Sequence, residues 1–532
     1  MSILIIIVLC LFLLISYLII IRPYQYWTKK GVRQRSVAKL WLENFKTILQ
    51  LTPMADSITA VYSEFPNDRY TGTYQFASKL LLIRDPELIK QITVKDFDHF
   101  VDHNQILFED AEPLFSKNLM SLRGERWKEM RATLSPSFTS RKMKAMFGII
   151  MECAQTFVRH FQREDGQVVT VELKDVFTRL TNDIIASASF GIVCDSLKDR
   201  DNEFYKMGKE ATNFSGFWKV LSFLIILSSP RLAKFLGIRF FDEKVSAFFK
   251  NLVVSNIEER EKNGIVRPDM IHLLMQARKG KLEHDRDNEV IDTGFAVIEE
   301  SAIGKERKRN LQLTDDDVTA QALIFFFAGF ESVATLMCFT VYELAADPFV
   351  QQKLQMEIDN VLKESDGTLT YESLLKMEYL DMVISEALRK WPIAVATDRV
   401  CVKPYTIQPE REGEKPLRLE KGDVISILMY GMHRDAALFP DPDRFDPERF
   451  NRENKKNIGP YTYIPFGVGP RSCIANRFAL LEIKILIFNL LQHFEVVVVD
   501  KSDIPIKLSP KQFTLNAKNG FWFGFKSRRP SV

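Results

Sequence analysis

The sequence predicts a mainly α-helical protein with a smaller β region, preceded by a single transmembrane helix. Three observations lead to this prediction. Helical spacing of apolar residues dominates from about Pro86 to Trp391. Runs typical of β-strands are short and lie around residues 71–83 and near the carboxyl end. The first 21 residues are almost entirely apolar. With 46% hydrophobic and 27% charged residues, the 532-residue chain can form a large core and lacks the composition of a disordered protein.

Charge and cysteine content exclude several classes of protein. Lys and Arg number 72 against 69 Asp and Glu, a net charge of +3, so the overall basic excess of a nucleic-acid-binding protein is absent. We therefore expect no nucleic-acid partner. The six cysteines lie far apart without a CxxC pair, which fits neither a disulfide scaffold nor a zinc ribbon. A reducing compartment is expected.

Residues 1–21 form the predicted anchor. All but Ser2 and Ser16 are apolar, and a helix of this length spans ~30 Å, the thickness of the hydrocarbon core of a bilayer. A cleaved secretory signal is the alternative, but its charged start, shorter apolar run and small-residue cleavage site are not seen. Residues 22–50 form a basic linker with seven Lys and Arg against one acid, Glu43. The positive-inside rule then places residues 51–532 in the cytoplasm.

The body contains further recognisable segments. The eight-residue apolar run 220–227 is predicted to belong to the core, with a loop in the membrane surface as the alternative. A charge-dense stretch over residues 278–312 is predicted to be an exposed connection. A helix is predicted to begin after the hydroxyl cap Thr314 and its three following aspartates. It runs about nine turns to Ala346 through the core. Near the end, residues 496–499 and an Asn519–Gly520 turn predict strands and a hairpin.

The most informative segment is PFGVGPRSCIA at residues 465–475, which precedes a helical pattern over residues 476–491. Cys473 therefore lies at a helix start, where free amides and the helix dipole lower the pKa of a thiol and favour the metal-binding thiolate. The neighbouring residues allow close approach to a flat partner, pack on it and pair with an anion. They are Phe466, Gly467, Gly469 and Arg471. A buried inert cysteine is the alternative, but these neighbours favour a haem-thiolate site.

This loop resembles the haem-binding loop of the cytochrome P450 family, Phe-x-x-Gly-x-Arg-x-Cys-x-Gly. The matching residues are Phe466, Gly469, Arg471 and Cys473. Ala475 replaces the last glycine, and we expect its methyl group to leave binding intact. The resemblance implies that residues 51–532 are a catalytic domain with the cytochrome P450 fold. It also implies that Cys473 is the axial iron ligand of haem b, iron protoporphyrin IX.

The predicted core helix carries a second motif, Ala328-Gly329-Phe330-Glu331-Ser332. A glycine costs ~1 kcal/mol relative to alanine in a helix, and an unpaired buried carboxylate costs more. The alternative is structural, with Gly329 for close packing and Ser332 bonded to its own backbone. In the family this motif forms the oxygen groove and relays protons. The resemblance therefore implies that Ala328 and Gly329 border the haem and that Glu331 and Ser332 are catalytic. Serine in place of the commoner threonine loses a methyl group that restricts its rotamer, so we expect weaker coupling of electrons to product.

Charged residues complete the resemblance. Glu386 and Arg389 are three residues apart on a helical pattern, and Arg449 follows in the order of the family's structural Glu-Arg-Arg triad. The resemblance also implies that four residues face the haem propionates, with His103 as a weaker fifth candidate. They are Trp127, Arg131, Arg399 and Arg471. A surface arginine beside a core tryptophan is the alternative for Arg131 and Arg399, and an ordinary loop histidine is the alternative for His103.

The implied activity is monooxygenation, in which one oxygen atom from O2 enters a lipophilic small molecule. Substrates are xenobiotics such as plant toxins or insecticides, or endogenous lipids and hormones. Electrons come from NADPH through NADPH-cytochrome P450 reductase, with cytochrome b5 as a second donor. The protein resembles insect microsomal members of the xenobiotic-metabolising clan, which implies the endoplasmic reticulum membrane. Two alternatives remain open: a haem-thiolate isomerase or dehydratase that uses no external O2, and a membrane-tethered haem- or lipophile-binding protein without turnover.

Two surfaces follow from this activity. An acidic reductase needs a basic docking face, and the candidates are Lys128, Arg131, Lys142, Lys144, Lys455, Lys456 and Arg477. A lipophilic substrate needs an apolar pocket, and the candidates are Ile106, Leu107, Phe108, Phe214, Phe217, Phe325, Val395 and Ala396.

Overall fold

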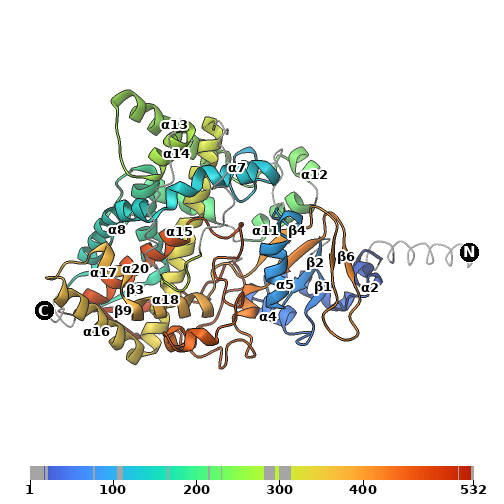
Figure 1. Cartoon of the computed structure of the whole chain (residues 1–532). Coiled ribbons are helices and arrows are strands. Elements are labelled where there is room, and N and C mark those ends of the chain that lie inside the picture. The colour runs from blue at the N-terminus through green and yellow to red at the C-terminus, as the bar shows by residue number, and fades with distance from the viewer. Residues whose placement is uncertain are drawn as a thin grey trace, which may run out of the picture.

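The computed structural model describes residues 17, 22–75, 78–104, 112–163, 167–213, 216–228, 230–280, 294–298, 313–512 and 514–528. The predicted anchor, apart from Tyr17, lies outside the described residues, as do four predicted pocket residues, Ile106, Leu107, Phe108 and Phe214. Helices form most of the molecule, and a sheet-rich part lies at the end nearest the amino terminus (Figure 1). The predicted class, mainly α with a smaller β region, is confirmed.

The helices follow one another along the whole described chain. The first group precedes the long central helix and comprises α2 (Tyr26–Lys29), α3 (Val37–Ile48), α4 (Met54–Tyr62), α5 (Pro86–Lys90), α6 (Pro113–Ser116), α7 (Gly124–Leu134), α8 (Ser140–Phe161), α9 (Leu173–Ile185), α10 (Glu203–Thr212), α11 (Phe217–Ser228), α12 (Pro230–Phe235), α13 (Glu243–Asn263) and α14 (Met270–Arg278). The second group comprises α15 (Asp315–Ala346), α16 (Pro348–Glu364), α17 (Tyr371–Leu375), α18 (Glu378–Lys390), α19 (Met429–Met432) and α20 (Asn476–His493). Short 3-10 or π-helical turns are η2 (Arg22–Gln25), η3 (Gln91–Lys95), η4 (Phe97–His99), η5 (Ser135–Phe138), η6 (Ala186–Phe190), η7 (Pro447–Phe450) and η8 (Asn454–Asn457).

Three small sheets hold the strands. They are β1 (Tyr70–Gln75), β2 (Ser78–Ile83), β3 (Val168–Glu172), β4 (Thr397–Val400), β5 (Tyr405–Ile407), β6 (Leu417–Leu419), β7 (Val424–Ile427), β8 (Phe494–Val497) and β9 (Trp522–Ser527). The largest sheet has the order β1-β2-β7-β4, with β2 and β7 parallel and the other pairs antiparallel. The predicted strands around residues 71–83 and 496–499 are confirmed as β1, β2 and β8.

The prediction of a carboxyl-terminal hairpin at the Asn519–Gly520 turn is wrong, because the segments on its two sides do not pair with each other. Residues Asn519 and Gly520 precede β9, which pairs with β3 and β8. The chain just before this turn pairs elsewhere, since Ala517 forms a bridge with Leu508. The positive φ of Gly520, +85°, suits a bend. The Asn-Gly signal therefore marks a change of direction between two separate pairings.

The central helix α15 confirms the helix predicted after Thr314. The Thr314 hydroxyl accepts a hydrogen bond from the Asp317 amide (3.1 Å), and the Asp317 carboxylate accepts one from the Thr314 amide (3.0 Å). This capping box satisfies two free amides at the helix start. The helix packs on α9, α13, α18 and α20 and belongs to the main hydrophobic core. Within the part of the chain that the structure describes, it is also the one helix long and apolar enough to span a membrane, although it is mostly buried in the protein.

Two other predicted segments differ from expectation. The apolar run 220–227 lies in α11, where Ile226 is buried while Trp218, about two turns before Ile226, is 74% exposed. The segment thus belongs only partly to the core. In the connection over residues 278–312, Ala296 is only 4% exposed, so that part is not the predicted exposed chain. Residues 294–298 pack against the core because an apolar turn is available there between the charged stretches.

Candidate functional site

The cysteine loop is a tight turn built on two glycines. Gly467 and Gly469 have φ of +76° and +72°, which glycine adopts without strain. The Cys473 amide donates to the Phe466 carbonyl (2.9 Å), which closes the loop. A Cβ atom on Gly469 would lie 2.1 Å from the carbonyl oxygen of Thr93 in η3. Gly469 is therefore required for packing of this loop as well as for its conformation.

Ala475 is compatible with the backbone it occupies. It caps α20 with φ −97° and ψ 18°, a conformation open to any residue with a side chain. The loop therefore does not need the family's glycine here. Ala475 is half-buried and packs against the edge of the main core.

The Cys473 thiol lies deep in the protein, although the residue keeps some accessible surface. Burial raises the pKa of the Cys473 thiol, while the Ala475 amide and the Arg131 guanidinium oppose that rise. The position of Cys473 at a helix start predicts a lowered pKa. That expectation is wrong for the protein alone, because desolvation of the sulfur outweighs the amides. A thiolate here needs a cation in contact with the sulfur, which a coordinated iron ion supplies.

Three arginines gather behind the cysteine loop, and all are buried. The Arg131 side chain on α7 donates to the Ser472 carbonyl (2.7 Å), and Arg399 on β4 donates to the Val468 carbonyl (3.0 Å). Arg471 donates to the carbonyls of Val101 (2.7 Å), Leu119 (3.3 Å) and Leu122 (2.7 Å) and lies 3.5 Å from the Asp102 carboxylate. Arg471 also lies over the ring of Trp127, 3.9 Å from the centroid.

The charge of this cluster fits a bound dianion. Burial lowers the pKa of Arg399 to about 10, and burial together with the other two arginines lowers the pKa of Arg471 to about 9. The Nε atom of Arg399 is buried and lacks a hydrogen-bond partner among the described residues. Such a site stabilises anionic groups, and the two propionates of a haem meet this need. The residues present therefore fit the haem that the cysteine loop implies.

His103 has a different partner from the one the sequence suggested. Its Nδ1 atom lies 3.0 Å from the Asp398 carboxylate and 3.1 Å from the Asp398 carbonyl oxygen. Burial lowers the pKa of His103 below its usual value. His103 thus helps to hold Asp398 next to Arg399, and a direct contact with a propionate is not required to explain it.

The oxygen-groove motif lies midway along α15. Ala328 is exposed although buried residues flank it along the helix, which leaves open space against this turn. A Cβ atom on Gly329 would lie 2.5 Å from the Ile185 Cδ1 atom of α9, so glycine allows the two helices to pack. The Ser332 hydroxyl donates to the Ala328 carbonyl, and the Glu331 carboxylate pairs with Lys174 of α9 (2.6 Å). Both expected relay groups therefore have partners in the protein.

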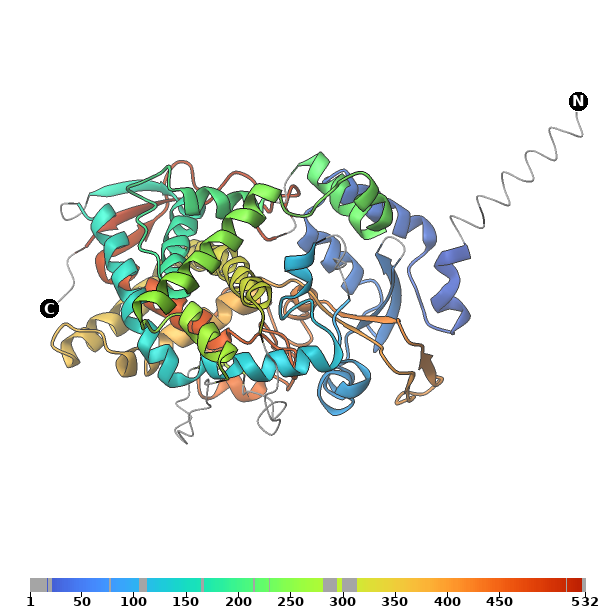
Figure 2. The ribbon, with the colours of Figure 1, turned by 90° about the horizontal axis from the view of Figure 1, so that it is seen from above.

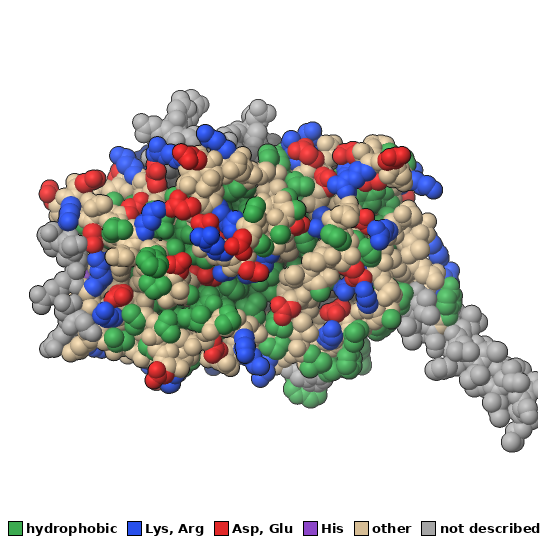
Figure 3. All heavy atoms as spheres, turned by 90° about the horizontal axis from the view of Figure 1, so that it is seen from below, with side chains coloured by type: hydrophobic (Ala, Val, Ile, Leu, Met, Phe, Trp, Pro, Cys, Tyr) green, Lys and Arg blue, Asp and Glu red, His purple; other side chains and the backbone are tan. Residues whose placement is uncertain are grey.

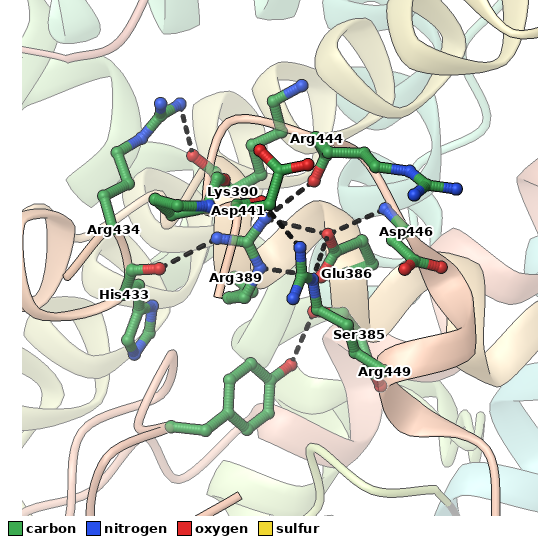
Figure 4. A network of polar contacts seen from close by, with 12 residues as sticks. Ser385, Glu386, Arg389, Lys390, His433, Arg434, Asp441, Arg444, Asp446 and Arg449 are labelled. Carbon is green, nitrogen blue, oxygen red and sulfur yellow. Dashed lines mark hydrogen bonds and ion pairs between the residues drawn. The ribbon is translucent and has the colours of Figure 1, made fainter. Parts of the chain in front are cut away.

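The three residues of the predicted triad contact one another (Figure 4). The side chains of Glu386 and Arg389 are fully buried, and that of Arg449 is 13% exposed. The Arg389 guanidinium donates to both oxygens of Glu386 (2.7 and 2.8 Å), and Arg449 donates to Glu386 over 3.4 Å. Arg389 also donates to the His433 carbonyl (2.8 Å). Removal of one partner would leave a buried charge without compensation. The triad thus joins α18 to the chain that leads into the cysteine loop.

Other expected residues are scattered. Arg131 is buried, so its expected role on a basic docking face is wrong, because its guanidinium points to Ser472. Lys128 pairs with Asp98 and Glu125, and Lys144 pairs with Glu372. Lys455 and Lys456 are exposed, and Lys142 and Arg477 are half-buried. Of the pocket candidates, Val395 and Ala396 line a cavity of about 230 Å³ between α3, α4 and the large sheet, and Phe325 packs on Phe138. The side chain of Phe217, another candidate, is not among those that the structure describes.

Some functional partners were not found from the sequence. Asp102 and Asp398 balance the arginines, Lys174 holds Glu331, and His433 accepts a hydrogen bond from the Ile464 amide (3.0 Å). No spacing rule indicates Asp102, Lys174 or His433, since each is distant in the sequence from the group it contacts. Asp398, in contrast, directly precedes Arg399 in the sequence. Within the described ranges, no three His, Cys, Asp or Glu side chains gather as a metal site. A haem iron would need one protein ligand, and Cys473 would provide it.

A half-buried cysteine in a glycine loop, three buried arginines and a long helix with an exposed turn are the features that a haem-thiolate site would need. Comparisons with known proteins agree. The family model for cytochrome P450 matches residues 42–522. The chain is 45% identical to cytochrome P450 9e2 of Blattella germanica, over 97% of this chain and 96% of that protein. It is 41% identical to probable cytochrome P450 9f2 of Drosophila melanogaster, over 90% of each chain, and 34% identical to cytochrome P450 6k1 of Blattella germanica, over 97% and 95%.

The chain belongs to the cytochrome P450 family. It is therefore a monooxygenase whose cofactor is haem b. The relatives are insect members, as the motifs in the sequence suggested.

Proposed function

We propose that this protein is a membrane-bound monooxygenase that inserts one atom of O2 into lipophilic small molecules, with electrons from NADPH. The observation that carries the proposal is the joint presence of Cys473 in its glycine loop and three buried arginines behind it. When bound, haem supplies an iron that activates dioxygen. Side chains of this chain would hold the haem, leave space for dioxygen and deliver protons, while the electrons would come from a partner protein.

Cys473 would ligate the iron, while Arg131 and Arg399 would hold the propionates. Phe466 would pack on the macrocycle. Trp127 and Arg471 support this arrangement from behind, since Arg471 lies over the Trp127 ring and bonds three carbonyls. The exposed turn at Ala328 would provide space for dioxygen beside α15, while Gly329 lets this part of the helix pack on α9.

Glu331 and Ser332 would deliver protons. Their present partners suit that role, because Lys174 positions the Glu331 carboxylate, and the Ser332 hydroxyl can leave the Ala328 carbonyl by rotation about one bond. To deliver a proton, the Glu331 side chain would move between its contact with Lys174 and the open space beside Ala328. This agrees with a position at the edge of the buried core, since the Glu331 side chain is 26% exposed.

The proposed location is the endoplasmic reticulum membrane, with residues 1–21 as anchor and the catalytic domain in the cytoplasm. Support comes from an apolar face next to the amino-terminal segment. Helices α3 and α11 contact one another, and Figure 2 shows them side by side. Hydrophobic side chains gather at that edge of the surface in Figure 3. The large exposed apolar residues of this face are Trp41, Leu42, Phe45, Trp218, Leu232, Phe235 and Leu236.

A lipophilic substrate fits this placement. The cavity lined by Val395 and Ala396 lies against α3, so an apolar molecule dissolved in the membrane has a short path to it. We propose that NADPH-cytochrome P450 reductase, with cytochrome b5 as a second donor, docks through the exposed Lys455 and Lys456 and the half-buried Lys142 and Arg477. A screen of candidate substrates in the presence of reductase distinguishes a xenobiotic substrate from an endogenous one.

The test is the reduced carbon-monoxide difference spectrum of the membrane-bound protein beside that of Cys473→Ala. We expect a thiolate-type absorbance that is lost in the variant. Cys401→Ala is the matched control, because Cys401 is also buried but its thiol contacts the Lys403 carbonyl (2.9 Å) and not the cysteine loop. A well-folded wild-type protein without a haem spectrum would overturn the proposal. NADPH-dependent oxygen uptake with product formation then separates monooxygenation from isomerisation or simple binding.

A further inference from the structure

Residues 294–298, called here the docked turn, lie against the core beside the cysteine loop. They occupy the middle of the charged connection between α14 and α15. Ala296 is 4% exposed, and the other four residues are half-buried. The Val297 amide donates to the Gly294 carbonyl (3.2 Å), which closes the turn on itself. A five-residue apolar turn that is buried in this way has a specific binding surface on the core.

The first anchor of the docked turn is Asp381 on α18. One carboxylate oxygen accepts a hydrogen bond from the Phe295 amide (2.9 Å), and the other pairs with Lys484 of α20 (2.8 Å). The Lys484 side chain is 1% exposed, so this ion pair is held firmly. Gly294 has φ +121°, and a Cβ atom there would lie 1.9 Å from the Asp381 carboxylate. Only glycine therefore permits the turn to dock.

The second anchor is aromatic. The Phe295 ring lies 5.1 Å from the ring of Phe450 and 5.5 Å from that of Tyr463. The Tyr463 hydroxyl donates to the Ser385 carbonyl on α18 (2.9 Å), and the His433 ring stacks on Tyr463 at 5.5 Å. The docked turn thus packs on the chain that enters the cysteine loop and on the surroundings of the triad.

The third contact leads directly to the iron ligand. The Ile298 amide donates to the side-chain oxygen of Asn476 (3.4 Å). The side-chain nitrogen of Asn476 donates to the Cys473 carbonyl (2.9 Å). Asn476 is 6% exposed, and its amide orientation is fixed because one neighbour is a donor and the other an acceptor. Asn476 therefore bridges the docked turn and Cys473.

We propose that the docked turn is a positioning element for Cys473. Through Asn476 it fixes the Cys473 carbonyl, and through Asp381 and Lys484 it fixes α20, the helix that follows the cysteine. Groups that orient a ligand to a metal affect how well the metal is held. The inference rests on the haem-ligating role proposed for Cys473. Asn476, Gly294 and Phe295 are then positioning residues, since they act only through the cysteine loop.

The experiment measures amide hydrogen exchange of the full-length protein, in the peptide covering residues 294–298 and in that covering residues 472–478. Gly294→Ala and Phe295→Ala are the test variants. Gly280→Ala is the matched control, because Gly280 also has a positive φ, +64°, but its Cβ atom would meet nothing within 4 Å. We expect both test variants to raise exchange about tenfold in both peptides, since undocking exposes their amides. The control should leave both peptides at the wild-type rate.

A second readout separates positioning from a merely structural role. In the ferrous carbon-monoxide complex, the test variants should convert from the thiolate-type absorbance to the thiol-type absorbance severalfold faster than Gly280→Ala. The proposal is overturned if residues 294–298 exchange at the intrinsic rate in the wild type, or if undocking leaves residues 472–478 unchanged. If exchange is coupled but the wild type has no thiolate absorbance, the proposed function fails while the coupling of the docked turn to the loop stands.

Discussion

At the scale of single residues, the two glycines of the cysteine loop differ in how closely their neighbours approach. Gly469→Ala places a Cβ atom 2.1 Å from the Thr93 carbonyl at a φ of +72°, so we expect a loss of about 3 kcal/mol of stability. Gly467→Ala is the control, because its φ of +76° adds strain but its nearest atom is 3.7 Å away. We expect a loss of about 1 kcal/mol there. Thermal unfolding and haem content per protein measure both effects. Equal losses in the two variants would show that the Thr93 contact does not matter.

Ala475 gives the opposite expectation for the same loop. Because its φ is −97°, Ala475→Gly relieves no strain and adds freedom to the unfolded chain. The variant should bind haem as well as the wild type and lose up to about 1 kcal/mol of stability. Haem titration and thermal unfolding provide the measurement. Tighter haem binding in Ala475→Gly would mean that the methyl group crowds the macrocycle.

His433 makes stability depend on pH. Burial and the neighbouring Arg389 lower its pKa from 6.5 to about 3. Between these values the unfolded chain binds a proton that the folded chain does not, so stability falls as pH falls from 6.5 toward 3. At pH 5 the loss is about 2 kcal/mol. His433→Gln keeps an acceptor for the Ile464 amide and should lack this loss. Urea unfolding at several pH values measures it, with His160→Gln on the exposed face of α8 as control. Parallel pH profiles for His433→Gln and the wild type would contradict the assignment.

At the scale of secondary-structure elements, α15 and α9 are joined at the proposed proton relay. Lys174 contacts both Glu331 (2.6 Å) and the Thr335 hydroxyl (2.5 Å). Glu331→Gln keeps the shape but cannot exchange a proton, so we expect about 100-fold slower NADPH-dependent turnover with an unchanged carbon-monoxide spectrum. Thr335→Val removes the other partner of Lys174 and should change turnover little. Equal turnover of Glu331→Gln and the wild type would remove Glu331 from the reaction.

The sequence predicts an element correctly where the residues that determine it are close together in the chain. The start of α15 depends on Thr314 and Asp317, which are three residues apart, so the prediction was correct. The glycine loop and the pair Glu386–Arg389 are local in the same sense. The pairing of Glu331 with Lys174 and the docking of residues 294–298 depend on residues distant in the chain. The raised pKa of the Cys473 thiol depends on burial, which spacing does not indicate. The cysteine loop could therefore be predicted from its motif. The contacts that support the site from distant parts of the chain could not.

At the scale of the whole molecule, the apolar face on α3, α11 and α12 predicts which side meets the membrane. Phe235 on α12 is 86% exposed, and Phe349 at the start of α16 is 84% exposed, at the opposite end of the molecule (Figure 1). In microsomes we expect the Phe235→Cys thiol to react with a membrane-impermeant maleimide at least about tenfold more slowly than the Phe349→Cys thiol, since burial in lipid excludes the reagent. Detergent should equalise the two rates. Burial raises the pKa of the native Cys153 thiol to about 12 and that of Cys401 to about 11, so these two thiols add little background reaction. Equal rates before detergent would contradict contact of this face with the bilayer. The proposed short path from the membrane to the cavity would then be wrong.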